Sequence, residues 1–575
     1  MISLIDLLKN KINNFVLKHD EKPWENYYGK IPKHLEYPKF SIYELLEKTV
    51  SKYPKYIAYE YFDKQVTYKK LYNKIESAAK ALKNIGVIEN DHITICMPNT
   101  PEAIIMFYAV NMVGAIANMI HPLSSEKEIE FYINKSNSRF ILSLDLTYNK
   151  VLMASRNTKI EKIIIAHLND DMKTIMSVLY YMTSGYKNKI KIDKKNTVTW
   201  DKFIADGINY EGIYKTSRNS DDDAVILYSG GTSGTPKGIV LTNLNFNALA
   251  LQSHLMCDPA KAGDSVLVIM PIFHGFGLGV CIHAPLYVGM KCVLIPQFKA
   301  QDFAKLIKKY KPAFLVGVPT MYEALINSKF TKKKYLTSVS TVVSGGDVLN
   351  PILRKKINQY LVKHGSDAQV RVGYGLTEST AASCLTPKLY YKEGSIGLPF
   401  PDTLYKIVKI GTTKETKVNQ DGEICINGPT VMKRYLDEEV ETTNTLKKHS
   451  DGKIWLHTGD VGYIDEEGIV FFKSRIKRII ISSGYNIYPH YIEKVLNMHP
   501  AVETSIVIGV DHPYKIQVPK AYIVLKPEFT LNEKLKKEIK LYCERFIAKY
   551  SLPYEYEYRE SLPKTLIGKI AFNKL

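Results

Sequence analysis

A loop rich in glycine, serine and threonine follows an apolar run that ends at Tyr228. Residues 228–238 read Tyr-Ser-Gly-Gly-Thr-Ser-Gly-Thr-Pro-Lys-Gly. Glycines lack a Cβ, so their backbone N–H groups can approach phosphate oxygens, and hydroxyl side chains add further donors. A lysine ammonium adds positive charge. The sequence therefore predicts a polyphosphate-binding loop, whose contacts we expect from Thr232, Ser233, Gly234, Thr235 and Lys237.

Two other interpretations of this loop fit less well. In a Walker loop, glycine immediately precedes the lysine and a serine or threonine follows it to bind magnesium. Here the neighbours of Lys237 are Pro236 and Gly238. A merely flexible connection is the second alternative, but such connections seldom combine these residue types directly after an apolar strand.

Three further motifs follow this loop in order along the chain. They read Gly373-Tyr-Gly-Leu-Thr-Glu-Ser379, Leu456-His-Thr-Gly-Asp-Val-Gly-Tyr-Ile-Asp465 and Pro563-Lys-Thr-Leu-Ile-Gly-Lys569. With the loop, they resemble the adenylate-forming superfamily of acyl-CoA synthetases, luciferases and peptide-synthetase adenylation domains. The resemblance covers nearly the whole chain, and four ordered matches are far more specific than any one of them.

The resemblance implies which residues contact ATP. Tyr374, beside Gly375, is implied to pack on adenine, which suits an aromatic face. Thr377 is implied to contact the α-phosphate, and Glu378 to hold Mg²⁺, which prefers hard oxygen ligands. Asp460 is implied to accept hydrogen bonds from the ribose hydroxyls, and Arg475 to lie near the ribose and phosphate. The backbone at Gly345 and Gly346 is implied to border both adenine and the acyl pocket.

The resemblance also implies a two-step reaction in which the protein supplies no nucleophile. The carboxylate of an acid attacks ATP, giving an acyl-adenylate and pyrophosphate, and the thiol of coenzyme A then displaces AMP. Lys569 resembles the lysine that stabilises negative charge during adenylation. Lys477 matches the hinge of a rotating C-terminal domain, and the loop with Ser483 and Gly484 is implied to enter the site for thioester formation. Ser483 and Ile567 depart from the residues common at these positions.

The acid itself is harder to predict. His274, in the segment Met270–Gly279, stands at the family's aromatic position beside the substrate carboxylate, and a core histidine is the alternative. We expect an ATP-dependent acid–CoA ligase acting on a medium- or long-chain fatty acid. An aryl acid–CoA ligase and an acyl-adenylating enzyme that loads a separate carrier protein are the alternatives. A nucleic-acid-binding protein with a degenerate fold disagrees with the intact motifs.

Alternating strand and helix patterns from about residue 40 to 400 predict an α/β fold with largely parallel pairing. We expect a large N-terminal domain over residues 1–474, with a β-rich subdomain from about 401 to 474, and a small mobile α+β domain over 475–575. The longest weakly charged apolar stretch, Val266–Pro296, is interrupted by histidines, glycines and a lysine. It therefore predicts buried strands rather than a membrane span.

Composition is that of an ordinary globular protein. Of 575 residues, 45% are hydrophobic and 24% charged, which excludes a disordered chain. The formal net charge of +20 favours anionic partners, but lysines dispersed over a solvated surface explain it equally well. Seven cysteines without Cys-x-x-Cys spacing and no secretion signal predict a cytoplasmic protein. The basic insertion Met176–Lys195 is expected to form a packed surface helix, with peripheral contact with the inner membrane surface as the alternative.

Overall fold

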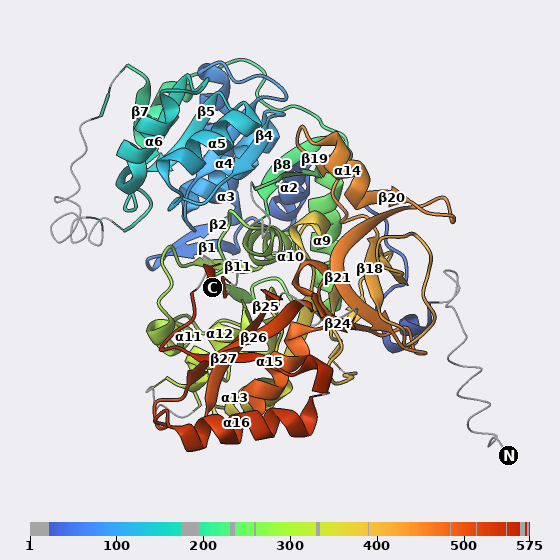
Figure 1. Ribbon diagram of the computed structural model, residues 1–575. Coiled ribbons are helices and arrows are strands. Elements are labelled where there is room, and N and C mark those ends of the chain that lie inside the picture. Colours follow the sequence, from blue (N-terminus) through green and yellow to red (C-terminus); the bar gives the residue numbers. More distant parts are fainter. Residues whose placement is uncertain are drawn as a thin grey trace.

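The computed structural model describes residues 22–173, 177, 192–193, 195–229, 236–257, 260–328, 334–388, 390–482, 485–512, 515–547, 549–563, 570–571 and 574–575. These residues form a large N-terminal domain and a smaller C-terminal domain (Figure 1). The basic insertion Met176–Lys195 lies almost entirely outside the described residues.

The first sheet of the large domain has eight strands. Its central part is parallel, and only β9 and β19 at one edge run antiparallel to their neighbours. In spatial order the strands are β19 (Arg434–Tyr435), β9 (Gly238–Thr242), β8 (Asp223–Tyr228), β4 (Ile116–Met119), β3 (His92–Cys96), β5 (Phe140–Leu144), β6 (Lys162–Ala166) and β7 (Thr197–Thr199).

The second sheet has nine strands and is again parallel in its middle, with antiparallel strands at both edges. In spatial order they are β16 (Leu398–Pro399), β15 (Cys384–Leu385), β14 (Val370–Tyr374), β13 (Thr341–Ser344), β12 (Phe314–Gly317), β10 (Ser265–Val268), β11 (Lys291–Leu294), β1 (Ile57–Tyr61) and β2 (Lys64–Thr67). Parallel sheets of this kind confirm the predicted α/β class.

Helices cover both sheets, and one continuous hydrophobic core joins them. Helix α4 (Pro101–Met112) is apolar on all sides, and each of its residues is buried, as expected for a helix inside a core. The other helices of the large domain are α2 (Ile42–Lys52), α3 (Tyr68–Asn84), α5 (Glu126–Ser136), α6 (Tyr148–Ser155), α8 (Trp200–Gly207), α9 (Asn243–Met256), α10 (Ala284–Val288), α11 (Phe303–Tyr310), α12 (Pro319–Ile326), α13 (Pro351–Lys363), α14 (Glu439–Thr445) and the π-helical η4 (Phe276–His283).

The apolar stretch Val266–Pro296 is folded into this core. It contains most of β10, then η4, α10 and β11, which confirms buried protein rather than a membrane span. Within the described residues, no helix is both long and apolar enough to cross a membrane.

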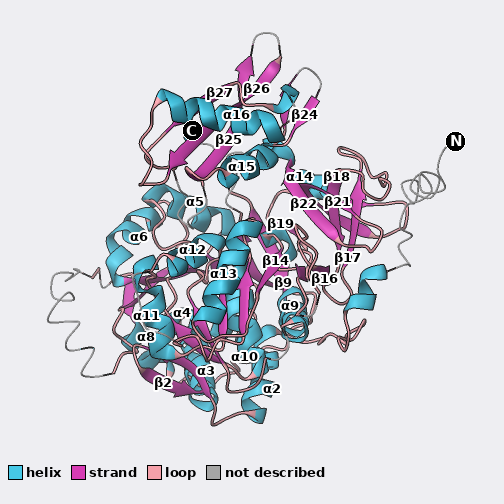
Figure 2. Ribbon diagram, turned by 90° about the horizontal axis from the view of Figure 1, so that it is seen from below, coloured by secondary structure: helices cyan, strands magenta, loops and turns pink. Residues whose placement is uncertain are grey.

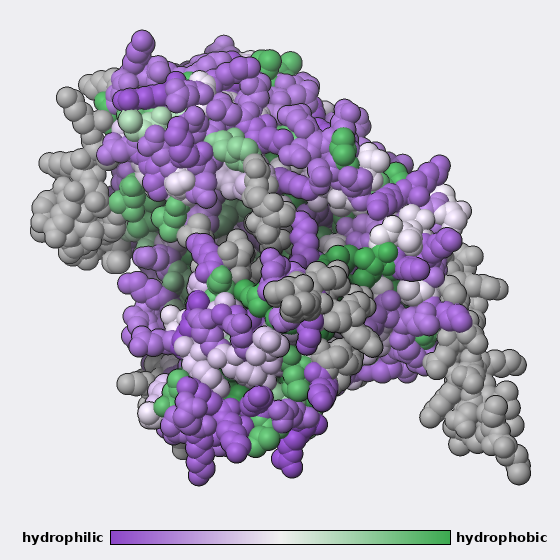
Figure 3. All heavy atoms as spheres, in the orientation of Figure 1, coloured by the Kyte–Doolittle hydropathy of each residue, from purple (hydrophilic) through white to green (hydrophobic). Residues whose placement is uncertain are grey.

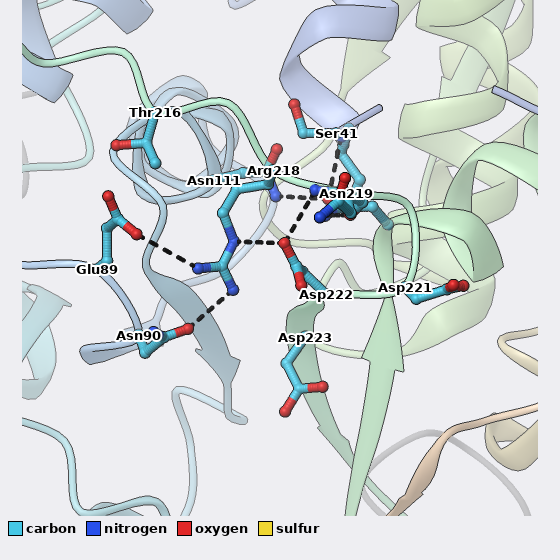
Figure 4. A network of polar contacts seen from close by, with 12 residues as sticks. Ser41, Glu89, Asn90, Asn111, Thr216, Arg218, Asn219, Asp221, Asp222 and Asp223 are labelled. Carbon is cyan, nitrogen blue, oxygen red and sulfur yellow. Dashed lines mark hydrogen bonds and ion pairs between the residues drawn. The ribbon is translucent and has the colours of Figure 1, made fainter. Parts of the chain in front are cut away.

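A polar network fixes the start of β8, the strand that leads into the predicted phosphate loop (Figure 4). The Arg218 guanidinium lies 3.1 Å from Asp222 Oδ2 and donates to Asn90 Oδ1 over 2.8 Å. At the first residue of the strand, Asp223 Oδ2 lies 2.6 Å from the Arg434 guanidinium of β19. The network thus anchors the first residue of β8, whose last residue, Tyr228, precedes the phosphate loop.

The β-rich part follows the second sheet. Its five strands are β17 (Leu404–Val408), β18 (Gly422–Asn427), β20 (Leu446–Lys448), β21 (Ile454–Ile464) and β22 (Val470–Arg475). All of their pairings are antiparallel. Trp455, fully buried, packs in the core that this sheet shares with the rest of the large domain.

The C-terminal domain has its own sheet and its own hydrophobic core. Its strands are β23 (Ile480–Ser482), β24 (Tyr485–Ile487), β25 (Val502–His512), β26 (Ile516–Leu525) and β27 (Glu555–Tyr558), with helices α15 (Pro489–Met498) and α16 (Glu533–Phe546). Figure 2 shows these elements together at one end of the molecule. The sequence pattern predicts a longer final helix, Leu531–Tyr550. The helix begins at Glu533 because the Asn532 side chain caps it by accepting from the Leu535 N–H over 2.9 Å.

Candidate active site

A cavity of about 2650 Å³ is lined by residues of both domains. Every predicted site residue that the structure describes lines it: Lys237, His274, Gly345, Gly346, Tyr374, Gly375, Thr377, Glu378, Asp460, Arg475 and Lys477. Seven other predicted site residues lie outside the described residues: Thr232, Ser233, Gly234, Thr235, Ser483, Gly484 and Lys569.

Three of the lining residues form a polar group centred on Asp460, held by one hydrogen bond and one ion pair. The Tyr374 hydroxyl donates to Asp460 Oδ2 over 2.5 Å, and Arg475 Nε lies 2.8 Å from Asp460 Oδ1. Asp460 is only 1% exposed. Burial, and then the neighbouring Asp460 carboxylate, raise the pKa of Tyr374 well above its usual value, so its phenol remains a donor.

Sheet register explains why these three residues meet. Asp460 on β21 stands directly opposite Arg475 on β22 in the antiparallel pairing. Tyr374 is the last residue of β14, a central strand of the nine-stranded sheet. Because polar loops collect at the carboxyl ends of such strands, the site forms where the large sheet and the β-rich sheet meet.

A second group surrounds Glu378. Its Oε1 accepts from the Tyr435 hydroxyl over 3.0 Å, and the Lys237 ammonium lies 5.0 Å from the centre of the Tyr435 ring. Lys237 also pairs with the Glu441 carboxylate, a contact that lowers the pKa of Glu441. Glu378 therefore places a hard oxygen donor beside the lysine of the phosphate loop, which is the donor chemistry that Mg²⁺ requires.

Three glycines of the site are explained by their close neighbours or by their backbone conformation. A Cβ on Gly375 would lie 2.1 Å from the Ala381 carbonyl oxygen, so the chain admits no side chain there. A Cβ on Gly345 would meet Gly373 O at 3.3 Å and the Phe276 ring at 3.4 Å, so a small local shift would be needed. Gly346 has a φ of +75°, in the region that favours glycine.

The acyl side of the cavity is more apolar. His274 Nδ1 accepts from the Phe276 N–H over 3.2 Å, which orients the imidazole at the start of the π-helical segment. Further lining residues are Met270, Val288, Met290, Phe314 and Val316, from the strands and helix of the nine-stranded layer. Because these apolar residues line the same cavity as the polar group around Asp460, this side of the cavity can hold a hydrocarbon chain.

Sequence reasoning missed two residues of the site, Tyr435 and Glu441. Tyr435 lies 57 residues from Glu378 in the chain and is brought near by the pairing of β19 with β9. Glu441 follows on α14. Neither belongs to a recognisable motif, and no local pattern distinguishes them from surface residues.

An α/β domain and a small second domain around a cavity with aromatic, acidic and basic groups define an adenylate-forming enzyme by class. A family model described as AMP-binding enzyme matches residues 46–436, and the AMP-binding enzyme C-terminal domain matches residues 491–569. The long-chain-fatty-acid–CoA ligase of Bacillus subtilis is 31% identical over 563 residues, covering 96% of this chain and 98% of that protein. The enzyme of the same name from Haemophilus influenzae is 28% identical over 562 residues, covering 96% and 97%.

Solved structures show the same fold. A crystal structure of an anthranilate CoA ligase in complex with anthranoyl-AMP has a TM-score of 0.80 at 22% identity, covering 95% of this chain and 98% of that one. ATP-bound MatB from Rhodopseudomonas palustris also has a TM-score of 0.80 at 22% identity, covering 92% and 98%. The chain belongs to the AMP-binding enzyme family. It is an acid–thiol ligase of an ATP-dependent CoA ligase family.

Proposed function

We propose that this enzyme converts a medium- or long-chain fatty acid to its CoA thioester through an acyl-adenylate. The observation that carries this proposal is a single cavity that joins the polar group around Asp460 to an apolar wall around Val316. Relatives named long-chain-fatty-acid–CoA ligase, matched over nearly their full length, support the substrate class.

In the first half-reaction the acid carboxylate attacks the α-phosphorus of ATP, and the bond to pyrophosphate breaks. Tyr374 and Asp460 hold the adenosine part, the latter by accepting from ribose hydroxyls. Thr377 contacts the α-phosphate and Lys237 the departing phosphates. Glu378 would hold Mg²⁺, which neutralises phosphate charge. Two anions must approach each other in this step, so cationic groups lower its barrier.

We assign Lys569 to this half-reaction, where its ammonium stabilises the charge that develops on the phosphates. In the second half-reaction the CoA sulfur attacks the acyl carbonyl and AMP leaves. The segment with Ser483 and Gly484 serves that step. We place the domain boundary at residues 474 and 475 and the hinge at Lys477, which is exposed in a short 3-10 turn between the two domains. Rotation at this hinge would move the segment with Lys569 out of the site and bring the segment with Ser483 and Gly484 into it.

Two alternative functions keep the same class of enzyme but change one of its substrates. An aryl acid would fit the likeness to the anthranilate CoA ligase structure, which at 22% identity supports the fold only. A separate carrier protein could replace CoA as the acceptor.

The test is thioester formation by the full chain with ATP–Mg²⁺ and CoA across short-, medium- and long-chain fatty acids and benzoate. We expect the highest kcat/KM for the medium- or long-chain acids. A preference for benzoate would overturn the fatty-acid assignment. Adenylation without transfer to CoA would instead point to a carrier protein.

We further propose a cytoplasmic location, with peripheral membrane contact through the basic insertion at residues 176–195. The face shown in Figure 3 is mainly hydrophilic, and its apolar residues form small separate areas. Co-sedimentation with anionic liposomes that survives deletion of this insertion would refute its role.

A further inference from the structure

A buried cluster of one cysteine and two histidines lies in the β-rich sheet, outside the groups assigned to catalysis. Cys425 on β18 stands opposite His457 on β21 in the antiparallel register. His449 follows β20 and reaches the same point from the turn before β21. One ligand atom from each residue can be chosen so that all three lie within 4.8 Å of one another. Among the residues that the structure describes, this is the one such group identified.

The two imidazoles face each other through their Nε2 atoms, which are 2.9 Å apart. Zn–N bonds of about 2.1 Å at a tetrahedral angle place two ligand nitrogens about 3.4 Å apart, so a movement of roughly half an ångström would admit the ion. All three residues are buried, with exposed fractions of 0% for Cys425, 5% for His449 and 7% for His457.

A carboxylate orients one of these imidazoles. Glu423 Oε2 lies 2.7 Å from His457 Nδ1 and accepts a hydrogen bond from its N–H, which leaves the Nε2 lone pair of His457 directed toward His449. Metal-bound histidines in proteins usually donate their second ring N–H to a carboxylate or carbonyl in this way. The contact between Glu423 and His457 therefore favours metal binding at His457 Nε2.

The charges around the cluster suit a divalent ion. A Cys425 thiolate and the Glu423 carboxylate together offset the two positive charges of the metal, so the buried group would be neutral. The nearby Lys406 ammonium is itself paired, at 3.1 Å from Asp451 Oδ2, and lies 4.0 Å from the centre of the Trp455 ring.

We propose that Cys425, His449 and His457 bind one Zn²⁺ ion. Thiolate and imidazole are the donors that zinc prefers, and three protein ligands with a water in the fourth position is a known zinc arrangement. His457 also lines the large cavity, so water has a route to that position.

The site would act on the loop that carries Asp460. Glu423 Oε1 accepts from the Gly459 N–H over 3.0 Å, and Gly459 has a φ of +70° immediately before Asp460. By fixing His457, and through it Glu423, the ion would stabilise this turn. In this role the ion would support the hairpin that carries Asp460.

The test uses the full chain, expressed without a polyhistidine tag and stripped of metal. It is titrated with Co²⁺, a spectroscopic substitute for Zn²⁺, and bound zinc is counted after reconstitution. We expect one equivalent of either ion, a near-ultraviolet thiolate-to-cobalt charge-transfer band and a rise in melting temperature with Zn²⁺. Cys425→Ser should abolish the band and His449→Gln should weaken binding at least tenfold. Cys96→Ser, at a buried strand cysteine of the eight-stranded sheet, should change neither.

Either of two results would overturn the proposal. One is the absence of stoichiometric binding and of the charge-transfer band in the unsubstituted protein, a measurement that does not depend on any variant folding. The other is a band that persists in Cys425→Ser, because the thiolate would then come from elsewhere.

Discussion

The hydroxyl of Tyr374 lies 2.5 Å from Asp460 Oδ2, although 86 residues separate them in the chain. This contact joins the end of a central strand of the nine-stranded sheet to the β-rich sheet. Arg475 approaches the other carboxylate oxygen, so both oxygens of Asp460 are held in the position from which we propose that they bind ribose hydroxyls.

Asp460→Asn should weaken ATP binding strongly. The amide keeps the shape of the side chain but loses the charge that strengthens its hydrogen bonds, a loss of about 1.5–3 kcal/mol. We expect a Kd for a non-hydrolysable ATP analogue that is about 10- to 100-fold higher, measured by calorimetry. Asp402→Asn, at a partly buried carboxylate that contacts His34, Leu35 and Tyr37 and does not line the cavity, is the control and should leave the Kd unchanged. An unaltered Kd in Asp460→Asn would refute the ribose role.

Glu441→Gln should have a smaller effect of opposite sign. Glu441 pairs with Lys237, so it competes with the phosphates for the same ammonium. Both side chains are partly exposed, and such pairs contribute at most about 1 kcal/mol. The affinity for ATP–Mg²⁺ should therefore rise by up to about fivefold, and less at high salt.

Glu439→Gln, on the same helix, is the control for the loss of one negative charge. If it raised ATP affinity as much as Glu441→Gln, the effect would be one of net charge rather than of competition for Lys237.

Two glycine substitutions should separate stability from function. Gly375→Ala forces a Cβ against the Ala381 carbonyl, and we expect about 1–3 kcal/mol of destabilisation, seen as a lower melting temperature. Gly345→Ala needs only a small shift of its neighbours, so its melting temperature should fall much less than that of Gly375→Ala. Gly345 lines the cavity, and kcat/KM for the acid should fall about 10- to 100-fold. A large loss of stability in Gly345→Ala together with an unchanged melting temperature in Gly375→Ala would contradict the steric explanation.

Buried His283 should make the fold sensitive to acid. Its Nδ1 accepts from the Tyr108 hydroxyl over 3.0 Å, its Nε2 lies 3.1 Å from Asn247 Oδ1, and burial lowers its pKa to about 3. Below its ordinary pKa of 6.5 the unfolded chain binds a proton that the folded protein excludes, so stability falls as the pH falls. This group alone should remove about 2 kcal/mol between pH 7 and pH 5.

Denaturant unfolding at several pH values checks this prediction. His283→Gln should show a shallower loss of stability with acid than the unsubstituted protein, whatever its absolute stability. His34→Gln removes a largely exposed imidazole and should leave the slope unchanged. Equal slopes for all three proteins would mean that His283 is not the acid-sensitive group.

The positions of the motifs could be predicted because each one is local. Tyr374, Thr377 and Glu378 follow a strand whose β-branched residues are visible in the sequence, and the structure places them on the wall of one cavity with Lys237. The roles of these residues remain predictions.

What could not be predicted depends on pairings between distant segments. The contact of Glu378 with Tyr435 requires β19 to add to the edge of the eight-stranded sheet, and a two-residue strand has no periodicity to read. The meeting of Cys425, His449 and His457 likewise depends on strand register, which spacing along the chain does not reveal.

Acid-dependent exchange of radiolabelled pyrophosphate into ATP, in the absence of CoA, tests the central claim most directly. If an acyl-adenylate forms, exchange should occur with a fatty acid that the enzyme converts to its thioester, stop without acid, and fall by about 100-fold or more in Lys569→Ala. Thioester formation without any such exchange would contradict the two-step account.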